Sequence, residues 1–197
     1  IAGWFILLPN EYKQLGKHIA ASSAFFANIS LWREVGYFDS SADLKPLLHL
    51  WSLGIEEQFY LFWPLILYAA WRLKINLLSS CLLIFIASFL INLWLMQFSN
   101  SAAFYLPVTR AWELSAGAII ALLKIQKYNS NGTLNKYSIK IFNGFASNKK
   151  LSSLTELSGI LTIVLYFVFA GQPGYTVWSS GIPAAGAALI ILSGTNG

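Results

Sequence analysis

Long apolar runs separated by short polar linkers constrain the fold of this 197-residue chain more than any other feature. Four runs approach the roughly 20 residues that a helix needs to cross a hydrocarbon core, and two shorter runs flank them. The four lie at about 53–73, 77–98, 105–123 and 154–170, and the shorter ones at 1–8 and 182–192. Backbone groups in lipid must be hydrogen-bonded within each segment. The sequence therefore predicts an all-α, polytopic transmembrane bundle, and the many small residues of 182–192 favour close helix packing there.

The composition supports membrane insertion and excludes several other classes of protein. Hydrophobic residues make up 56% of the chain and charged residues only 11%, against about 25% in a soluble domain. The net charge of +5 does not indicate nucleic-acid binding, because the basic residues are not interleaved with aromatic ones on a polar face. The single cysteine, Cys81, lies inside an apolar run and is expected to pack there. We find no metal-ligand spacing and no phosphate-binding glycine loop.

The basic residues predict which linkers lie inside the cell. Linkers 72–76 and 124–152 together carry eight basic residues and no acid, whereas 99–104 and 171–181 carry no charge. Since Lys and Arg concentrate on the cytoplasmic side, we place the two basic linkers inside and 9–51 outside. Helical spacing of apolar residues at 134–145 predicts a helix at the inner interface, in contact either with anionic lipid or with the phosphates of a cytoplasmic donor. The chain lacks an initiator Met and a signal peptide, and we expect it to be an internal part of a longer protein.

The first motif with candidate chemistry begins the 53–73 run from outside. Ser52 is positioned to cap the helix, and Glu56 follows near the positive end of the helix dipole. Tyr60 lies one turn further on the same face, and Pro64 frees the carbonyl of Tyr60 from its helical hydrogen bond. Charges are costly in a span, so these groups need a partner or a function. Alternatively, the acids only cap the helix at the headgroup level, within a belt of aromatic residues.

The second motif, residues 104–113, enters its run from the same side. Arg110 and Glu113 are three residues apart and either neutralise each other or belong to a site. Because both motifs start outside, we predict that five residues converge on one outward-facing polar pocket. These five are His49, Glu56, Tyr60, Arg110 and Glu113. They offer an acid, a base and a cation for proton transfer and oxyanion stabilisation, with His49 a candidate general base and His18 a weaker one.

Residues 46–53 followed by 56–60 closely resemble the acyltransferase type 3 family of bacterial membrane O-acyltransferases. The family pattern Ser-Leu-x-x-Glu-x-x-x-Tyr falls on Ser52, Leu53, Glu56 and Tyr60. Residues 36–39 and 104–113 are similar to its O-antigen and peptidoglycan O-acetylase branch. The resemblance is strong over 9–68 and 104–123, fainter over 154–194, and absent from the lysine-rich linker, and we expect all 197 residues to be part of one such membrane domain.

This resemblance implies a multi-pass protein of the bacterial inner membrane. It implies transfer of an acyl group, usually acetyl from acetyl-CoA, to a hydroxyl of lipopolysaccharide, peptidoglycan or a related surface glycan. The expected partners are thus membrane lipid, acyl-CoA and the glycan, without nucleic acid, metal or a tightly bound cofactor. The family's catalytic histidine lies in a first transmembrane region before this chain, and many members add a C-terminal SGNH-type domain. We therefore expect these 197 residues to be inactive alone.

The resemblance also assigns roles to individual residues. We expect Glu56, Tyr60 and His49 to act in catalysis. Substrate binding is expected from four residues: Trp51, Ser52, Arg110 and Glu113. Two other functions remain open, namely a transporter of lipid-linked glycan that binds cargo without chemistry, and a structural subunit whose charges only hold helices together. Inverted repeats would favour the transporter, and we see none.

Overall fold

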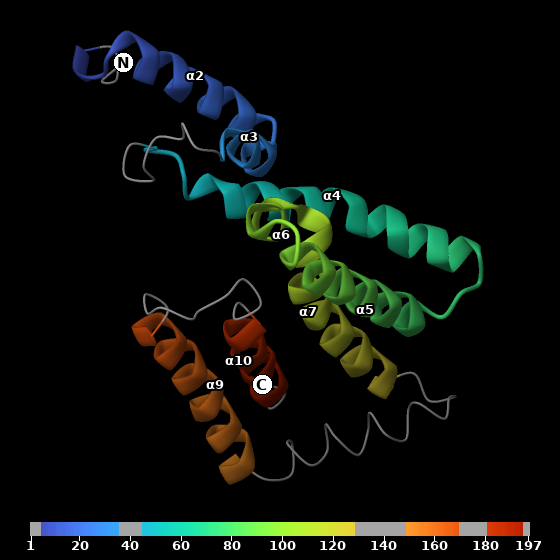
Figure 1. The fold of residues 1–197 in the computed structure, drawn as a ribbon. Coiled ribbons are helices and arrows are strands. Elements are labelled where there is room, and N and C mark those ends of the chain that lie inside the picture. Colours follow the sequence, from blue (N-terminus) through green and yellow to red (C-terminus); the bar gives the residue numbers. More distant parts are fainter. Residues whose placement is uncertain (1–4, 36–44, 129–148, 170–180, 195–197) are drawn as a thin grey trace. The chain divides into compact units, whose positions relative to one another are not determined.

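The computed structural model describes residues 5–35, 45–128, 149–169 and 181–194, with side chains omitted for 124–128. Within these ranges the chain is helical and has no strand, which confirms the all-α prediction (Figure 1). The helices are α2 (Pro9–Ser23), α3 (Ala27–Glu34), α4 (Leu50–Arg72), α5 (Leu77–Met96), α6 (Asn100–Tyr105), α7 (Pro107–Tyr128), α9 (Lys149–Phe169) and α10 (Gly181–Ser193). The interfacial helix predicted at 134–145, the 36–39 motif and residues 1–4 lie outside the described residues.

Among the described residues, three segments are long and apolar enough to cross a membrane: Leu77–Met96, Asn100–Leu123 and Lys149–Phe169. They correspond to three of the four predicted complete spans. The fourth, at 53–73, forms the 23-residue helix α4. This helix has the length of a span but is less apolar than the three segments above. Glu56, Glu57 and Gln58 interrupt its apolar surface near the start, and Arg72 ends it. The crossing of α4 therefore stays a prediction. Helix α10 is apolar but shorter than a span.

The chain divides into two compact units, which we describe separately. The first comprises 1–68 and 90–110, and thus holds α2, α3, most of α4, the end of α5, α6 and the first residues of α7. Helices α2 and α3 are joined by three residues, of which Phe25 adopts the left-handed conformation (φ 60°). This conformation is uncommon for an aromatic residue, and it allows the chain to turn between two helices without a longer loop.

Buried amide side chains lie among the apolar core residues of the first unit, such as Leu31 and Ile55. Asn28 is fully buried on α3 and donates from Nδ2 to the carbonyl of Tyr105, at 3.0 Å. Its Oδ1 accepts from Nε2 of Gln58 on α4, also at 3.0 Å, and the same nitrogen donates to the carbonyl of Phe25 at 2.5 Å. Gly54 allows α3 and α4 to lie this close together, because a Cβ at position 54 would lie 3.1 Å from Asn28 Oδ1. These bonds join α3, α4 and the end of α6.

A second buried amide holds α5 against the α6–α7 connection. Asn92 donates from Nδ2 to the carbonyls of Thr109, at 3.1 Å, and of Ala103, at 3.4 Å. The helix breaks at Leu106, which is extended and precedes Pro107. Asn92 thus binds carbonyls on both sides of the break and fixes where α7 begins.

The second unit, comprising 69–89 and 111–197, includes a close α9–α10 pair. A Cβ on Gly159 would lie 2.7 Å from the carbonyl oxygen of Gly186, and one on Gly186 would lie 2.9 Å from that of Gly159. Ser152 Oγ donates to the carbonyl of Ser193 at 2.9 Å. The predicted close packing of 182–192 is therefore confirmed, and glycine at 159 and 186 is what permits it.

Candidate functional site

Aromatic rings from both sequence motifs surround one guanidinium group in the first unit. Arg110 Cζ lies 5.1 Å from the centroid of the Trp51 ring and 5.6 Å from that of Phe104. The Trp51 ring itself lies 4.3 Å from the Phe104 ring and meets Tyr105 edge-on at 5.7 Å. We call Trp51, Phe104, Tyr105 and Arg110 the Arg110 cage. The two motifs therefore do come together, through two of the four residues predicted for substrate binding, Trp51 and Arg110.

The local sequence explains the geometry of the cage. Trp51 is the second residue of α4, whereas Phe104 and Tyr105 end α6. Pro107 then begins α7, and Arg110 lies within its first turn, where it can return toward the α6 rings. A cation over an aromatic face gains roughly 0.5–2 kcal/mol, depending on how far it is desolvated. The N–H donors of a guanidinium lie in its plane, and aromatic rings contact its faces. The rings of the cage therefore position the Arg110 guanidinium, whose donors suit carboxylate or carbonyl oxygens.

The candidate residues on α4 occupy other faces of that helix. Glu56 is half-buried, and five helical positions separate it from Trp51, which places the two about 140° apart around the helix axis. Tyr60 follows Glu56 by one turn and is 58% exposed. Phe59 stacks on Trp63 at 4.7 Å, as an interfacial aromatic pair would, whereas Trp51 belongs to the cage. The convergence of Glu56 and Tyr60 with Arg110 stays a prediction.

The start of α4 differs from the prediction. His49 is exposed in the turn that precedes the helix, and α4 begins at Leu50, three residues earlier than a cap at Ser52 requires. Ser52 instead donates from Oγ to the carbonyl of His49, at 3.4 Å. The predicted capping role of Ser52 is therefore wrong, because the turn at 46–49 runs directly into the helix. Its predicted role in substrate binding is a separate matter and stays a prediction.

A cavity of about 570 Å³ lies beside the other half of the first motif. We call it the Phe25 cavity; its lining residues come from the α2–α3 joint, α3 and α4, namely Ala24, Phe25, Phe26, Ile29, Glu57, Gln58, Tyr60, Leu61 and Phe62. Tyr60, predicted from the sequence, lines this cavity. Glu57 does as well, although the sequence analysis assigned a role only to Glu56.

The second predicted pair is divided between the two units. Arg110 ends a segment of the first unit, while Glu113, half-buried and one turn later on α7, belongs to the second. In the second unit Trp112, the neighbour of Glu113, packs edge-on against Phe89, with ring centroids 5.2 Å apart, and against Gly181 of α10. The role of Glu113 in substrate binding stays a prediction.

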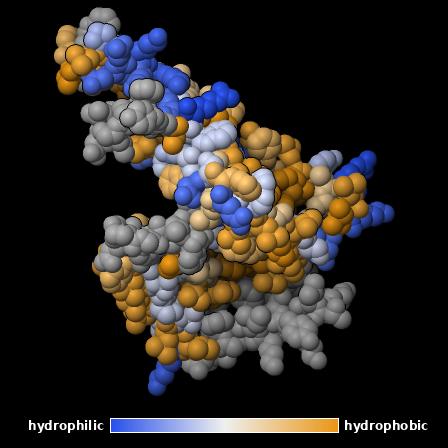
Figure 2. All heavy atoms as spheres, viewed as in Figure 1, coloured by the Kyte–Doolittle hydropathy of each residue, from blue (hydrophilic) through white to orange (hydrophobic). Residues whose placement is uncertain are grey.

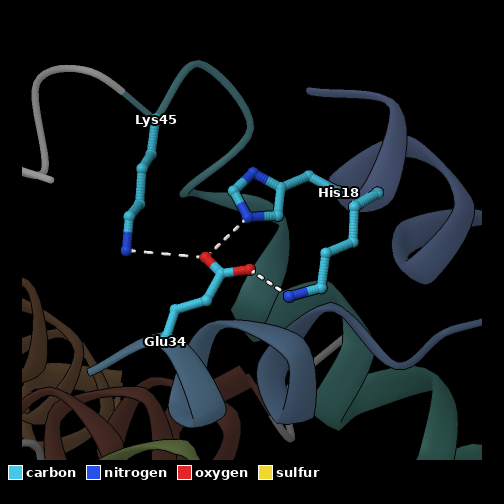
Figure 3. A network of polar contacts seen from close by, with 4 residues as sticks. His18, Glu34 and Lys45 are labelled. Atoms are coloured by element: carbon cyan, nitrogen blue, oxygen red, sulfur yellow. Dashed lines mark hydrogen bonds and ion pairs between the residues drawn. The ribbon is translucent and has the colours of Figure 1, made fainter. Parts of the chain in front are cut away.

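An ion-pair cluster in the first unit was not predicted. Figure 3 shows the carboxylate of Glu34 directed at His18 and Lys45. His18 Nε2 lies 2.7 Å from Glu34 Oε2, Lys17 Nζ 2.8 Å from Oε1, and Lys45 Nζ 3.6 Å from Oε2. Burial by itself raises the pKa of the Glu34 carboxyl, but the hydrogen bonds and charges of Lys17 and His18 outweigh it and hold that pKa below its ordinary value.

This cluster joins α2, α3 and the segment before α4, and His18 and Lys45 are buried in it. His18 and Glu34 come together only because the chain turns at Phe25, which lies between them in the sequence. Nothing in the residue pattern indicated a left-handed aromatic residue there. In this cluster His18 is a buried partner of Glu34, and its role as a weaker candidate base stays a prediction.

Comparison with known proteins assigns the family. The chain is 32% identical to the "Putative O-acetyltransferase SACOL0978" of Staphylococcus aureus, over 86% of this chain and 28% of that protein. It is also 32% identical to the "Putative peptidoglycan O-acetyltransferase YrhL" of Bacillus subtilis, over 66% of this chain and 22% of YrhL. The chain belongs to the acyltransferase family of these proteins. The predicted resemblance to a family of O-acyltransferases is thereby confirmed.

The matches also define how much of each relative this acyltransferase chain represents. An uncharacterized protein of Haemophilus influenzae is 35% identical over 59% of the chain and 51% of its own length. The chain thus spans about half of that relative and under a third of the two named O-acetyltransferases. No family model matches it, and no solved structure matches it. Together with the three apolar helices, the family makes this part of a membrane protein.

Proposed function

We propose that this chain is part of an integral membrane O-acyltransferase that transfers an acetyl group from acetyl-CoA to hydroxyls of a cell-surface glycan. Lipopolysaccharide O-antigen and peptidoglycan are the proposed acceptors, and the bacterial inner membrane is the proposed location. The names of the relatives support O-acetyl transfer. The observation that carries the proposal is the Arg110 cage, in which the two family motifs meet around one oriented cation.

The chemistry of acyl transfer explains why such a cation is useful. The acceptor oxygen forms a bond to the thioester carbonyl carbon, and the carbonyl oxygen becomes an oxyanion. When that intermediate collapses, the carbon–sulfur bond breaks, and the hydroxyl proton ends on the departing thiolate. A preorganised donor at the oxyanion is worth roughly 10²–10³ in rate. We assign this role to Arg110, held in place by Trp51 and Phe104.

The remaining predicted residues have complementary roles in this proposal. Glu56 and Tyr60 position the acceptor hydroxyl through hydrogen bonds. The proton is removed either by His49, exposed before α4, or by a histidine elsewhere in the full protein, as the family resemblance implies. Because α4 and α7 begin at the predicted outer side, the thioester of acetyl-CoA has to reach the cage from the cytoplasmic side.

The test uses the full-length protein in a host that lacks surface O-acetylation. Ester-linked acetate on purified surface glycan is measured by mass spectrometry at matched membrane levels of wild type and Arg110→Gln. We expect the wild type to add acetate and Arg110→Gln to add about 100-fold less. The matched control is Arg33→Gln, which removes the same charge from an exposed position of the same unit and should change acetate little.

The same measurement separates the enzyme from a transporter. If the wild type adds no acyl ester to any glycan fraction, acyl transfer is wrong. If, in addition, Arg110→Gln lowers the amount of glycan that reaches the surface, the cage binds cargo for export. Equal acetate from Arg110→Gln and Arg33→Gln would remove Arg110 from the site while leaving the enzymatic activity in place.

A further inference from the structure

Helix α3 is joined, through its two ends, to two of the elements that carry the Arg110 cage. Asn28, the second residue of α3, donates a hydrogen bond to the carbonyl of Tyr105, a member of the cage. Glu34, the last residue of α3, pairs with Lys45 at 3.6 Å, and Figure 3 shows the ammonium directed at that carboxylate. Lys45 precedes the turn that leads into α4, which carries the tryptophan of the cage.

The connection from Lys45 to that tryptophan is short and hydrogen-bonded. The carbonyl of Lys45 accepts from the amide of Leu48 at 3.0 Å, and the carbonyl of Leu48 accepts from the amide of Trp51 at 3.2 Å. Between them, Pro46 fixes its own φ and disfavours the helical conformation for Lys45. Two tight turns thus join the backbone of Lys45 to that of Trp51, and a displacement of the first displaces the second.

Burial distinguishes Lys45 from the other lysine that pairs with Glu34. Lys45 is 7% exposed, and a buried ammonium is costly unless it faces an anion. Lys17 lies on α2, which carries hydrophilic residues along its surface (Figure 2), and its side chain is 58% exposed. Although its Nζ is closer to Glu34, at 2.8 Å, water can replace the carboxylate there at little cost. The more distant lysine is therefore the one whose position depends on Glu34.

We infer that Lys45 is a positioning residue for the Arg110 cage: its ion pair with Glu34 fixes the turn before α4 and thereby holds the Trp51 ring over the guanidinium. The effect of Lys45 on acetate addition rests on the proposed function. Helix α3 is then the frame of the cage, because Asn28 holds the α6 side and Glu34 holds the α4 side.

The experiment compares the two lysines that pair with the same carboxylate. Lys45→Met and Lys17→Met are introduced separately into the full-length protein, and ester-linked acetate on purified surface glycan is measured at matched membrane levels. We expect Lys45→Met to add about tenfold less acetate than wild type, because a small displacement of Trp51 misplaces the Arg110 guanidinium. Lys17→Met, the matched control, should stay within about twofold of wild type. Equal losses in the two variants would overturn the inference.

Two further variants separate positioning from a general loss of structure. In a protein that already carries Trp51→Leu, adding Lys45→Met should lower acetate by less than about twofold, since the ring that Lys45 positions is gone. Lys45→Arg keeps the positive charge that faces Glu34, and should stay within about threefold of wild type because the ion pair is retained. An undiminished loss in the Trp51→Leu protein, or equal losses in Lys45→Arg and Lys45→Met, would contradict the inference.

Hydrogen exchange tests the inference without acetyl transfer. Amide exchange of residues 46–52 is followed by mass spectrometry in the full-length wild type, Lys45→Met and Lys17→Met. We expect exchange several-fold faster than wild type in Lys45→Met and unchanged in Lys17→Met, because only Lys45 anchors this turn. That result in a protein that adds no acetate supports the anchoring by Lys45 and contradicts acyl transfer. Acetate addition by wild type, with unchanged exchange in both variants, supports acyl transfer and contradicts the positioning by Lys45.

Discussion

The two units associate their helices in different ways. In the first, buried amides of Asn28, Gln58 and Asn92 bind backbone carbonyls where helices end or turn. In the second, Gly159 and Gly186 let α9 and α10 approach until their backbones touch. Amide-to-carbonyl bonds fix irregular places in the chain, whereas small residues fix only a distance between two regular helices. The candidate site lies in the first unit, where irregular geometry has to be held in place.

The largest expected effect comes from removing one amide. Asn28→Leu removes one of the two hydrogen bonds of Gln58 Nε2 and the bond to the Tyr105 carbonyl, at a cost of about 3 kcal/mol in the free energy of unfolding. It should also lower acetate addition by the full-length protein at least tenfold, because Tyr105 belongs to the Arg110 cage. Unfolding in mild detergent and glycan acetate measure the two effects. Asn100→Leu, at an exposed asparagine of α6, is the control and should leave both nearly unchanged.

A smaller effect is expected in the second unit. Gly159→Ala forces α9 and α10 apart and should cost about 2 kcal/mol, while acetate addition per folded molecule stays within twofold. Gly16→Ala is the matched control. A Cβ there meets nothing within 4 Å, so helix propensity should stabilise α2 by roughly 0.5–1 kcal/mol. A large loss of activity in folded Gly159→Ala protein would contradict the contrast between the units.

The smallest effect concerns the cluster at Glu34 and depends on pH. The folded-state pKa of Glu34 is lowered, so its ion pairs stabilise fully above the unfolded-state value, near 4.3, and this contribution is lost as pH falls through the folded-state value. Glu34→Gln should therefore be less stable than wild type by about 1 kcal/mol at neutral pH, and the difference should shrink below about pH 4.

Unfolding of wild type and Glu34→Gln across this range measures the effect. Glu156→Gln, which removes the same charge at an exposed position of α9, is the control. A difference between Glu34→Gln and wild type that stays constant down to pH 3, roughly one unit below the unfolded-state pKa, would show that Lys17 and His18 do not stabilise the ionised carboxylate.

The sequence predicted the helical class and three spans because hydropathy is a property of each segment alone. It could not establish α4 as a span, since Glu56, Glu57 and Arg72 make a site-bearing helix less apolar than its neighbours. Trp51 and Arg110 were each predicted to bind substrate, but the sequence paired Arg110 with Glu113 and not with Trp51. The contact of the Phe104 ring with Trp51 and Arg110 was not predicted, because the position of Phe104 depends on the helix break at Leu106. The Glu34 cluster depends in the same way on the conformation of Phe25.

The contact of Gly54 with Asn28 has a consequence for related sequences. A side chain at position 54 has to occupy the space that Asn28 Oδ1 and the Phe25 carbonyl now fill, so positions 28, 54 and 58 cannot change independently. Relatives with a larger residue at 54 are expected to carry a smaller one at 28, and a different donor at 58. Evolution of the Phe25 cavity is thereby restricted to the lining positions 57, 61 and 62, whereas positions 28, 54 and 58 vary only as a set.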